Sequence, residues 1–356
     1  MQNPQDQLNV AILGATGRVG QELIAVLESR KFPVGKFYPL ASARSANQTV
    51  RFLDKDYPVT EPSEEIFKDV DVVLASAGAS VSKHWVDKIV ECGAVIIDNS
   101  SAFRMDPAVP LVVPEVNGHA LKGHKGIIAN PNCSTSQLVV VLKILHELAG
   151  LKRVIVSTYQ SVSGEGKEAM EELEQQSKAL LNGSEVKTEV MPRQIAFNLI
   201  PKIDVFLEDG YTKEEAKVIE ETRKILELPD LKVTCTAVRV PVLIGHSEAV
   251  TCDLERPVSP AQVRESLSDS PIIEIWDQPE EGRYPTPIDC AGLDPVYVGR
   301  IRKDSSSENG INMWVVADNL RIGAALNAVR IAEYLLDHDL IESKSKSKKD
   351  GIPLNT

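Results

Sequence analysis

Cys133 stands where a turn leads into a long apolar segment. The preceding residues 130–132, Asn-Pro-Asn, favour a turn, and the leucine- and valine-rich segment 137–148 predicts a buried helix that begins near Cys133. The unpaired N–H groups and the positive dipole end of a helix N-terminus stabilise a thiolate, which makes Cys133 a candidate nucleophile. A lone cysteine beside an apolar helix is more often an inert buried residue, and position alone leaves this alternative open.

A histidine and an arginine near strand ends are further candidates. His246 follows the strand predicted at 233–242 through a glycine turn, which suits general acid or base catalysis and equally suits a structural histidine. Arg104 follows the strand predicted at 94–98. It could bind a phosphate or carboxylate there, or pair with Asp106 on the surface.

Two charged residues share one face of a predicted helix. Thr212 opens this helix with a capping box, and Glu214 and Lys217 lie three residues apart on it. The pattern alone predicts a solvated ion pair.

An apolar strand predicted at 8–13 leads into a glycine-rich loop and then into a helical pattern. The glycines allow a tight turn and let the backbone approach a pyrophosphate, which the helix N-terminus binds. The spacing G-x-x-G-x-x-G gains weight because it follows the first strand. The residues expected to contact the cofactor are Gly14, Ala15, Thr16, Gly17, Arg18, Val19 and Gly20 in this loop, and Ser76, Ala77 and Gly78 after the strand predicted at 70–75.

The segment after the second strand, predicted at 37–41, indicates the kind of dinucleotide. An NAD site places an acidic residue here to bind the ribose 2′-hydroxyl, whereas this chain has Ser42, Arg44 and Ser45. A cation and two hydroxyls suit the 2′-phosphate of NADP, and a solvated loop arginine is the alternative.

The pattern changes after the Cys133 helix. The segment 153–160 alternates like a strand with one exposed face, and further strands are predicted at 248–254, 296–302 and 311–317. We therefore expect an α/β protein with a Rossmann-type dinucleotide-binding domain and a second, α+β domain that has a mostly antiparallel mixed sheet. The expected boundaries are 1–132 with a C-terminal helix at 319–341 for the first domain, 133–318 for the second, and a disordered lysine-rich tail at 342–356.

Composition excludes several classes of partner. The 356 residues include 51 acidic and 39 basic ones, and the net charge of −12 argues against nucleic acid or an anionic membrane as partner. Five widely separated cysteines without a C-x-x-C pair predict neither disulfides nor a metal site. Without an apolar span or a signal peptide, we expect a cytoplasmic protein, or a plastid stromal one if a transit peptide has been removed.

Taken together, these residues resemble the aspartate-β-semialdehyde dehydrogenase family over nearly the whole chain. The resemblance rests on motifs that lie far apart and follow in the same order, at 14–20, 41–45, 130–135, 159–164, 239–242, 246–248, 284–287, 298–301 and 318–327. It implies an NADPH-dependent reductive dephosphorylation of L-aspartyl-4-phosphate to L-aspartate-4-semialdehyde and phosphate. That reaction leads to lysine (through diaminopimelate), threonine, methionine and isoleucine. The second domain would then be catalytic and would form a homodimer or a tetramer.

The resemblance also implies a role for each candidate residue. In catalysis, Cys133 would form a thioester, His246 would act as general acid or base, Gln160 would orient it or the substrate, and Asn132 would position the acyl group or stabilise its oxyanion. Four residues would bind the substrate: Arg104 and Lys217 its phosphate, Arg239 its α-carboxylate and Glu214 its amino group. Ser163, Gly164 and Asn319 would join the cofactor contacts, and no metal is implied.

Three loop residues depart from the family pattern. Ala79 and Asn47 stand where glycine is usual, and Glu165 stands where alanine is frequent. Ala79 could require a different backbone near the cofactor phosphates.

Two other functions are alternatives. N-acetyl-glutamyl-phosphate reductase shares the architecture and chemistry, but its substrate amine is acylated, so the anionic Glu214 favours the aspartyl substrate. A non-catalytic NADP-binding regulator would have no use for Cys133, Gln160 and His246 together.

Overall fold

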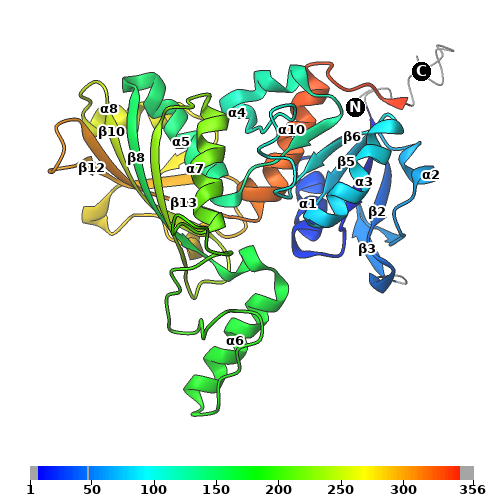
Figure 1. Cartoon of the computed structure of the whole chain (residues 1–356), viewed down its shortest axis with the longest axis horizontal. Coiled ribbons are helices and arrows are strands. Elements are labelled where there is room, and N and C mark those ends of the chain that lie inside the picture. Colours follow the sequence, from blue (N-terminus) through cyan, green and yellow to red (C-terminus); the bar gives the residue numbers. More distant parts are fainter. Residues whose placement is uncertain (1–6, 46–47, 345–356) are drawn as a thin grey trace. The chain divides into compact units, whose positions relative to one another are not determined.

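The computed structural model describes residues 7–45 and 48–344, and the chain divides into two compact units (Figure 1). Unit 1 combines the chain up to Pro131 with the chain from Ala324 onward, and unit 2 is Asn132–Gly323. The sequence placed the corresponding boundaries at 132/133 and 318/319.

Unit 1 is built on a parallel five-stranded sheet in the order β2-β1-β5-β6-β7. β1, β5 and β6 are buried along their whole length, as expected for a parallel sheet that helices cover. α1 and α10 pack against each other, and α3 packs on β6. The strands are β1 (Leu8–Leu13), β2 (Val34–Leu40), β5 (Val72–Ala75), β6 (Val95–Asp98) and β7 (Ile127–Ala129), and the helices are α1 (Arg18–Ser29), α2 (Glu64–Phe67), α3 (Ala79–Glu91), α4 (Pro114–Asn117) and α10 (Leu326–Asp337).

The strand order of this sheet reverses between β1 and β5, which is where doubly wound sheets bind their ligands. The Rossmann-type fold predicted for this part of the chain is therefore confirmed. A separate hairpin of β3 (Thr49–Phe52) and β4 (Lys55–Pro58) had not been predicted.

Unit 2 is built on a six-stranded mixed sheet in the order β11-β12-β13-β10-β8-β9. The pairs β8/β10, β10/β13 and β12/β13 are antiparallel, whereas β8/β9 and β11/β12 are parallel, so the predicted sheet type is confirmed. α5 packs against β8, β10, β13 and α7. The elements are α5 (Cys133–Ala149), β8 (Leu151–Gln160), α6 (Lys167–Leu181), α7 (Lys213–Leu226), β9 (Lys232–Arg239), β10 (His246–Leu254), α8 (Pro260–Ser268), β11 (Ile273–Ile275), α9 (Pro287–Cys290), β12 (Val296–Lys303) and β13 (Gly310–Ala317).

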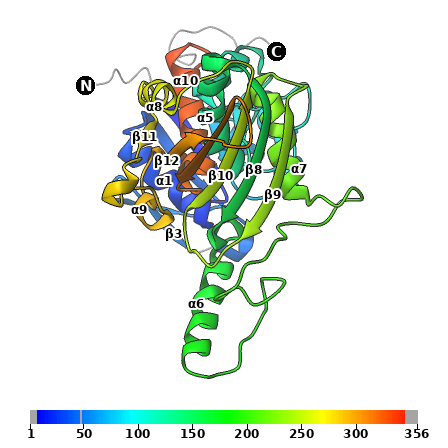
Figure 2. The ribbon, with the colours of Figure 1, turned by 90° about the vertical axis from the view of Figure 1, so that its left-hand side faces the viewer.

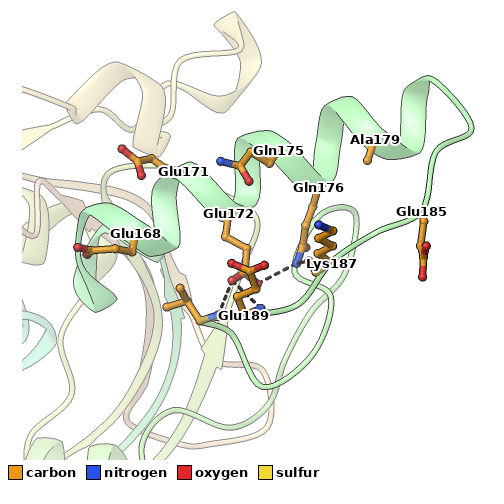
Figure 3. A pocket seen from close by; sticks show the side chains of 10 residues that line it. Glu168, Glu171, Glu172, Gln175, Gln176, Ala179, Glu185, Lys187 and Glu189 are labelled. Atoms are coloured by element: carbon orange, nitrogen blue, oxygen red, sulfur yellow. Dashed lines mark hydrogen bonds between the residues drawn. The ribbon is translucent and has the colours of Figure 1, made fainter.

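Within unit 2, α6 and the chain that returns along it (residues 167–200, the arm) extend away from the sheet (Figures 1 and 2). The buried Glu172 carboxylate fastens the returning chain to α6, because it accepts hydrogen bonds from the backbone N–H groups of Glu189 and Val190. Gln176 does the same with the N–H groups of Ile195 and Ala196. Figure 3 shows the pocket between the two segments, whose lining includes five glutamates and one lysine.

The described chain returns to unit 1 at Ala324. A short π-helical turn, Arg321–Ala325, precedes α10, so the helix predicted from 319 begins irregularly. Ser343 and Lys344, which the prediction assigned to the tail, are hydrogen-bonded: the Lys344 ammonium donates to the carbonyls of Phe67, Val70 and Cys92. Asn47 and residues 345–356 lie outside the described residues. No helix in the described part of the chain is long and apolar enough to cross a membrane.

Candidate active site

Cys133 is the first residue of α5, as predicted. Asn132 is the N-cap of this helix, and its side-chain Oδ1 accepts hydrogen bonds from the N–H groups of Ser134 and Thr135 at 3.0 and 3.3 Å. The Asn132 side chain also donates from Nδ2 to a Glu214 carboxylate oxygen at 2.7 Å. Asn132 therefore fixes the start of the helix, and thereby the position of the sulfur, while it holds a buried carboxylate.

His246 faces the sulfur directly, because its Nε2 lies 3.2 Å from Cys133 Sγ. The other ring nitrogen, Nδ1, accepts the backbone N–H of Ser161 at 3.1 Å. A backbone N–H can only donate, so the neutral ring carries its proton on Nε2, the atom that faces sulfur. Burial of the ring and the positive charge of Arg239 lower the pKa of His246 to about 3, against the opposing effect of Glu214. The ring is therefore neutral at physiological pH.

A buried carboxylate, Glu214, connects the substrate-site candidates. It accepts hydrogen bonds from Asn132 Nδ2, from Gln160 Nε2 at 3.0 Å, and from Lys217 Nζ at 3.1 Å. Burial opposes ionisation, but the Lys217 charge and these hydrogen bonds outweigh it and lower the pKa of Glu214. The solvated pair that the pattern suggested for Glu214 and Lys217 is thus wrong, because Glu214 is buried.

Arg239 is also buried and lies at the end of β9, beside Gln160 at the end of β8. Its Nη1 donates to the Ser161 carbonyl at 2.9 Å, and its Nη2 donates to the Glu165 carboxylate at 2.7 Å. A Cβ added at Gly164 would lie 3.1 Å from Arg239 Nη1 and 3.5 Å from the His246 ring. The glycine therefore lets the backbone pass close to both side chains.

Asn319 links the loops around the histidine. Its Oδ1 accepts the N–H of Gly245 at 2.9 Å and the hydroxyls of Ser161 and Ser163, both at 3.1 Å. Of the expected unit 2 contacts to the cofactor, Ser163, Gly164 and Asn319 thus lie together beside His246. Their binding of cofactor stays a prediction.

Gly323, in the π-helical turn, leaves no room for a side chain beside the nucleophile. A Cβ there would lie 2.7 Å from Cys133 Cβ and 2.9 Å from Cys133 Cα. We expect Gly323→Ala to displace the sulfur from His246 and to lower kcat about 100-fold, since a misplacement of about 1 Å can have this effect. Steady-state kinetics test this, with thermal unfolding to verify the fold.

Gly123→Ala is the matched control, because nothing lies within 4 Å of a Cβ there and its φ is not in the left-handed region. Full activity of Gly323→Ala would show that the close packing against Cys133 has no role in catalysis.

The glycine loop of unit 1 fits a dinucleotide phosphate. Gly14 has φ +96°, and a Cβ at Gly20 would lie 2.2 Å from the Gly14 carbonyl oxygen, so both positions require glycine. α1 follows with Gly17 as N-cap, with no side-chain cap and no acid in its first turn. Its first N–H groups therefore have no side-chain acceptor at the cap and suit an anion.

The other predicted cofactor residues of unit 1 adjoin this loop or face solvent. Thr16 Oγ1 lies 3.1 Å from Ser45 Oγ, and Arg44 is exposed. A Cβ on Gly14 would lie 3.0 Å from Ser76 Oγ and 3.1 Å from the Ala77 nitrogen, so the two loops touch. Gly78 is the N-cap of α3, and Ala79 begins that helix without a positive φ. The departure at Ala79 therefore needs no unusual backbone.

Arg104 is buried in unit 1, with 8% of its surface exposed. Its Nε donates to the Asn130 carbonyl at 2.9 Å and its Nη2 to the Asn99 carbonyl at 2.7 Å. These contacts hold the guanidinium at the carboxyl ends of β6 and β7.

Two family models match the chain. Residues 9–124 match the semialdehyde dehydrogenase NAD-binding domain, and residues 142–322 match the semialdehyde dehydrogenase dimerisation domain. An aspartate-semialdehyde dehydrogenase of Aquifex aeolicus is 53% identical over 93% of this chain and 99% of its own. The chain belongs to the aspartate-semialdehyde dehydrogenase family. The resemblance predicted from separated motifs is thereby confirmed, and the protein is an oxidoreductase.

Solved structures agree with this membership. A crystal structure of aspartate-semialdehyde dehydrogenase II from Vibrio cholerae, complexed with ASA, has a TM-score of 0.91 and 47% identity, over 93% of this chain and 98% of that one. The Candida albicans aspartate-semialdehyde dehydrogenase with NADP has a TM-score of 0.72 and 29% identity, over 92% and 98% of the two chains. The aspartate-semialdehyde dehydrogenase fold therefore extends over both units.

Sequence reasoning missed three residues of this site. Glu221 is buried and accepts the Asn132 N–H at 2.6 Å, and Asp204 pairs with Lys217 at 2.9 Å. Ser161 holds both His246 and Arg239. Glu221 lies seven residues after Glu214 on α7, and this helical spacing was a usable signal for a shared buried face.

Glu248 is a further buried acid near this site, two residues beyond His246 on β10, and the side-chain amide of Gln137 is its polar neighbour. Burial raises the pKa of Glu248 well above its usual 4.5, more than the neighbouring Gln137 amide lowers it. Above pH 4.5, the Glu248 carboxyl therefore keeps its proton in the folded protein and loses it in the unfolded chain. Stability falls as pH rises from 4.5 toward the folded-state pKa.

We expect Glu248→Gln to remove this pH dependence while preserving side-chain shape. Its melting temperature should match wild type near pH 4 and exceed it at pH 8, by about 2–4 °C for each kcal/mol gained. Differential scanning calorimetry at both pH values measures the two differences. An identical difference at both would mean that Glu248 does not titrate in this range.

Proposed function

We propose that this protein catalyses the NADPH-dependent reductive dephosphorylation of L-aspartyl-4-phosphate, in the route to lysine, threonine, methionine and isoleucine. The observation that carries the proposal is the 3.2 Å approach of His246 Nε2 to Cys133 Sγ, at the N-terminus of α5. Family membership and the ASA described with the Vibrio cholerae relative support the substrate.

The charged residues of unit 2 match the groups of this substrate. Arg239 suits the α-carboxylate because its planar guanidinium can bind two oxygens, and Lys217 suits the phosphate as a point charge. Glu214, buried and ionised, suits the free amino group. Arg104 of unit 1 is the second phosphate contact that the resemblance implies. An acylated amine would leave the Glu214 charge without this partner, which disfavours N-acetyl-glutamyl phosphate.

The geometry supports a thiolate nucleophile. A proton on His246 Nε2 donates toward sulfur, and the α5 N-terminus favours the same negative charge. The Cys133 thiolate attacks the acyl carbon, the bond to the phosphate oxygen breaks, and phosphate leaves and takes up a proton. NADPH, when bound, supplies the hydride that reduces the resulting thioester. The carbon–sulfur bond then breaks and the aldehyde leaves. The sulfur is again a thiolate that accepts a hydrogen bond from His246 Nε2–H.

Gln160 and Asn132 support this chemistry through a shared contact with Glu214. Both amides hold Glu214, and the Oδ1 of Asn132 is engaged by the helix N–H groups. Their Glu214 contacts favour positioning roles for both residues over the oxyanion contact considered for Asn132.

NADP is the cofactor that the residues of unit 1 favour. The glycine loop accepts a pyrophosphate sterically, and the exposed Arg44 with Ser42 and Ser45 suits a 2′-phosphate. The NADP of the Candida albicans relative agrees with this assignment.

Unit 2 exposes large apolar side chains in the segment 197–206, which suits a homodimer, in agreement with the dimerisation domain that it matches. Phe197, Leu199, Val205 and Phe206 are each more than half exposed, and contact with a second copy would remove such apolar surface from water. Light scattering should give a dimer mass, and Phe206→Glu should shift it toward the monomer. Leu53→Glu, at an exposed leucine of unit 1, is the control.

The direct test is phosphate-dependent oxidation of L-aspartate-4-semialdehyde, followed by NADPH absorbance. NADPH should form only with this aldehyde, inorganic phosphate and NADP present together. Activity with N-acetyl-glutamate semialdehyde instead would identify the protein as an N-acetyl-glutamyl-phosphate reductase. Tight NADPH binding without turnover of either aldehyde would indicate a non-catalytic NADP-binding regulator.

A further inference from the structure

Glu165 forms an ion pair with Arg239, the residue assigned to the α-carboxylate of the substrate. It ends the 3₁₀ turn Val162–Glu165, and its carboxylate accepts a hydrogen bond from Arg239 Nη2 at 2.7 Å. Among the described residues, this is the only hydrogen-bond partner of the Glu165 carboxylate. The Arg239 charge is therefore already balanced by an internal carboxylate.

Arg239 does not need Glu165 to hold its position. Its side chain is only 5% exposed, it ends β9, and its Nη1 is fixed by the Ser161 carbonyl at 2.9 Å. The Glu165 side chain, in contrast, is 50% exposed. Rotation of Glu165 into water would leave the guanidinium anchored, so the pair can open at the glutamate.

A pocket adjoins this ion pair. It measures about 210 Å³, and its lining includes Glu165 and Arg239 together with Lys202 and Asp204. Glu165 thus presents a carboxylate to Arg239 at the wall of a cavity, which is the same contact that an α-carboxylate would make. A bound acid and Glu165 would carry like charges around one guanidinium.

We propose that Glu165 competes with the substrate α-carboxylate for Arg239 and so raises KM for the aspartyl substrate. This inference rests on the proposed function, in which Arg239 binds that carboxylate. It also assigns an effect to Glu165, which stands where alanine is frequent in the family. Two effects weaken substrate binding: the Arg239–Glu165 contact must break, and the displaced negative charge stays near.

An alternative role for Glu165 would strengthen substrate binding and lower KM. The substrate amino group is attached to the same carbon as the α-carboxylate, so a glutamate beside Arg239 could bind the ammonium. Glu214 already accepts three hydrogen bonds, from Asn132, Gln160 and Lys217, which leaves it limited capacity for a further donor. Removing Glu165 would then weaken substrate binding, whereas competition predicts that it strengthens binding.

The test compares Glu165→Ala and Glu165→Gln with wild type in the oxidation of L-aspartate-4-semialdehyde. Both variants should lower KM for the aldehyde about two- to fivefold, the range expected for a partly exposed ion pair. They should leave kcat and the KM for NADP within about twofold. Glu168→Ala is the control, because Glu168 is an exposed acid at the start of α6 that lines the arm pocket and not the Arg239 pocket.

Succinate semialdehyde, which lacks the amino group, separates the outcomes. Competition predicts a lower KM for both aldehydes in the two variants. A raised KM with the aminated aldehyde alone would make Glu165 an ammonium contact and overturn the inference, as would an unchanged KM with both. Wild-type enzyme that converts neither aldehyde would overturn the proposed function itself.

Discussion

Cys133→Ser should lower turnover at least about 1,000-fold while NADPH binding stays nearly intact. A serine hydroxyl at the same position is not ionised near neutral pH, so neither the α5 N-terminus nor the His246 N–H has an anion to stabilise. The cofactor loop belongs to unit 1 and keeps its structure. Initial rates and fluorescence titration with NADPH measure the two effects separately.

Cys92→Ser is the matched control for this substitution. Cys92 and Cys133 are the partly exposed cysteines, whereas Cys235, Cys252 and Cys290 are buried, and burial raises the pKa of Cys252 and of Cys290 to about 12. Mass spectrometry of wild type with aldehyde and NADP, without phosphate, should detect an acyl adduct that Cys133→Ser lacks. More than a few per cent residual activity in Cys133→Ser would contradict the covalent mechanism.

Local signals predicted the elements that carry the site. The capping box at Thr212 is present with both of its hydrogen bonds, α5 begins at Cys133, and the glycine loop lies between β1 and α1 as predicted. Each depends on residues a few positions apart in the sequence, where spacing and backbone preference decide the structure. For such elements the sequence was sufficient.

Long-range burial was not predictable in the same way. Glu214 is a charged residue that its spacing to Lys217 alone would place in a solvated pair. It is buried instead, and Asn132, the N-cap of α5, and Gln160, at the end of β8, donate to it. No local pattern contains these partners. The β3/β4 hairpin was missed for another reason: its turn residues Leu53 and Asp54 both have positive φ, which a leucine rarely adopts.

The tautomer of His246 shows what tertiary structure adds to a motif. Sequence reasoning named the ring as general acid or base without choosing between its nitrogens. The Ser161 N–H makes that choice, because it occupies Nδ1 and leaves the proton on Nε2, 3.2 Å from sulfur. A histidine held in this way donates toward a thiolate and is poorly suited to accept the thiol proton.

His246→Leu should therefore lower kcat about 100- to 10,000-fold, the range associated with loss of a positioned acid or base. It should also slow alkylation of Cys133 by iodoacetamide at neutral pH, because leucine has no N–H to donate to the thiolate. The rates of both reactions, measured from pH 5.5 to 8.5 in wild type and variant, test the two effects. Cys92→Ser in each background confines the alkylation signal to Cys133 among the partly exposed thiols.

The pH dependence of alkylation shows which group gains the proton. Burial and Arg239 lower the pKa of His246 to about 3, so the ring does not gain a proton between pH 5.5 and 8.5. Any fall in wild-type alkylation toward pH 5.5 then reports protonation of the sulfur, and it should shift to higher pH in His246→Leu. Equal alkylation profiles combined with a large loss of kcat would contradict stabilisation of the thiolate. They would instead restrict His246 to the steps that follow thioester formation.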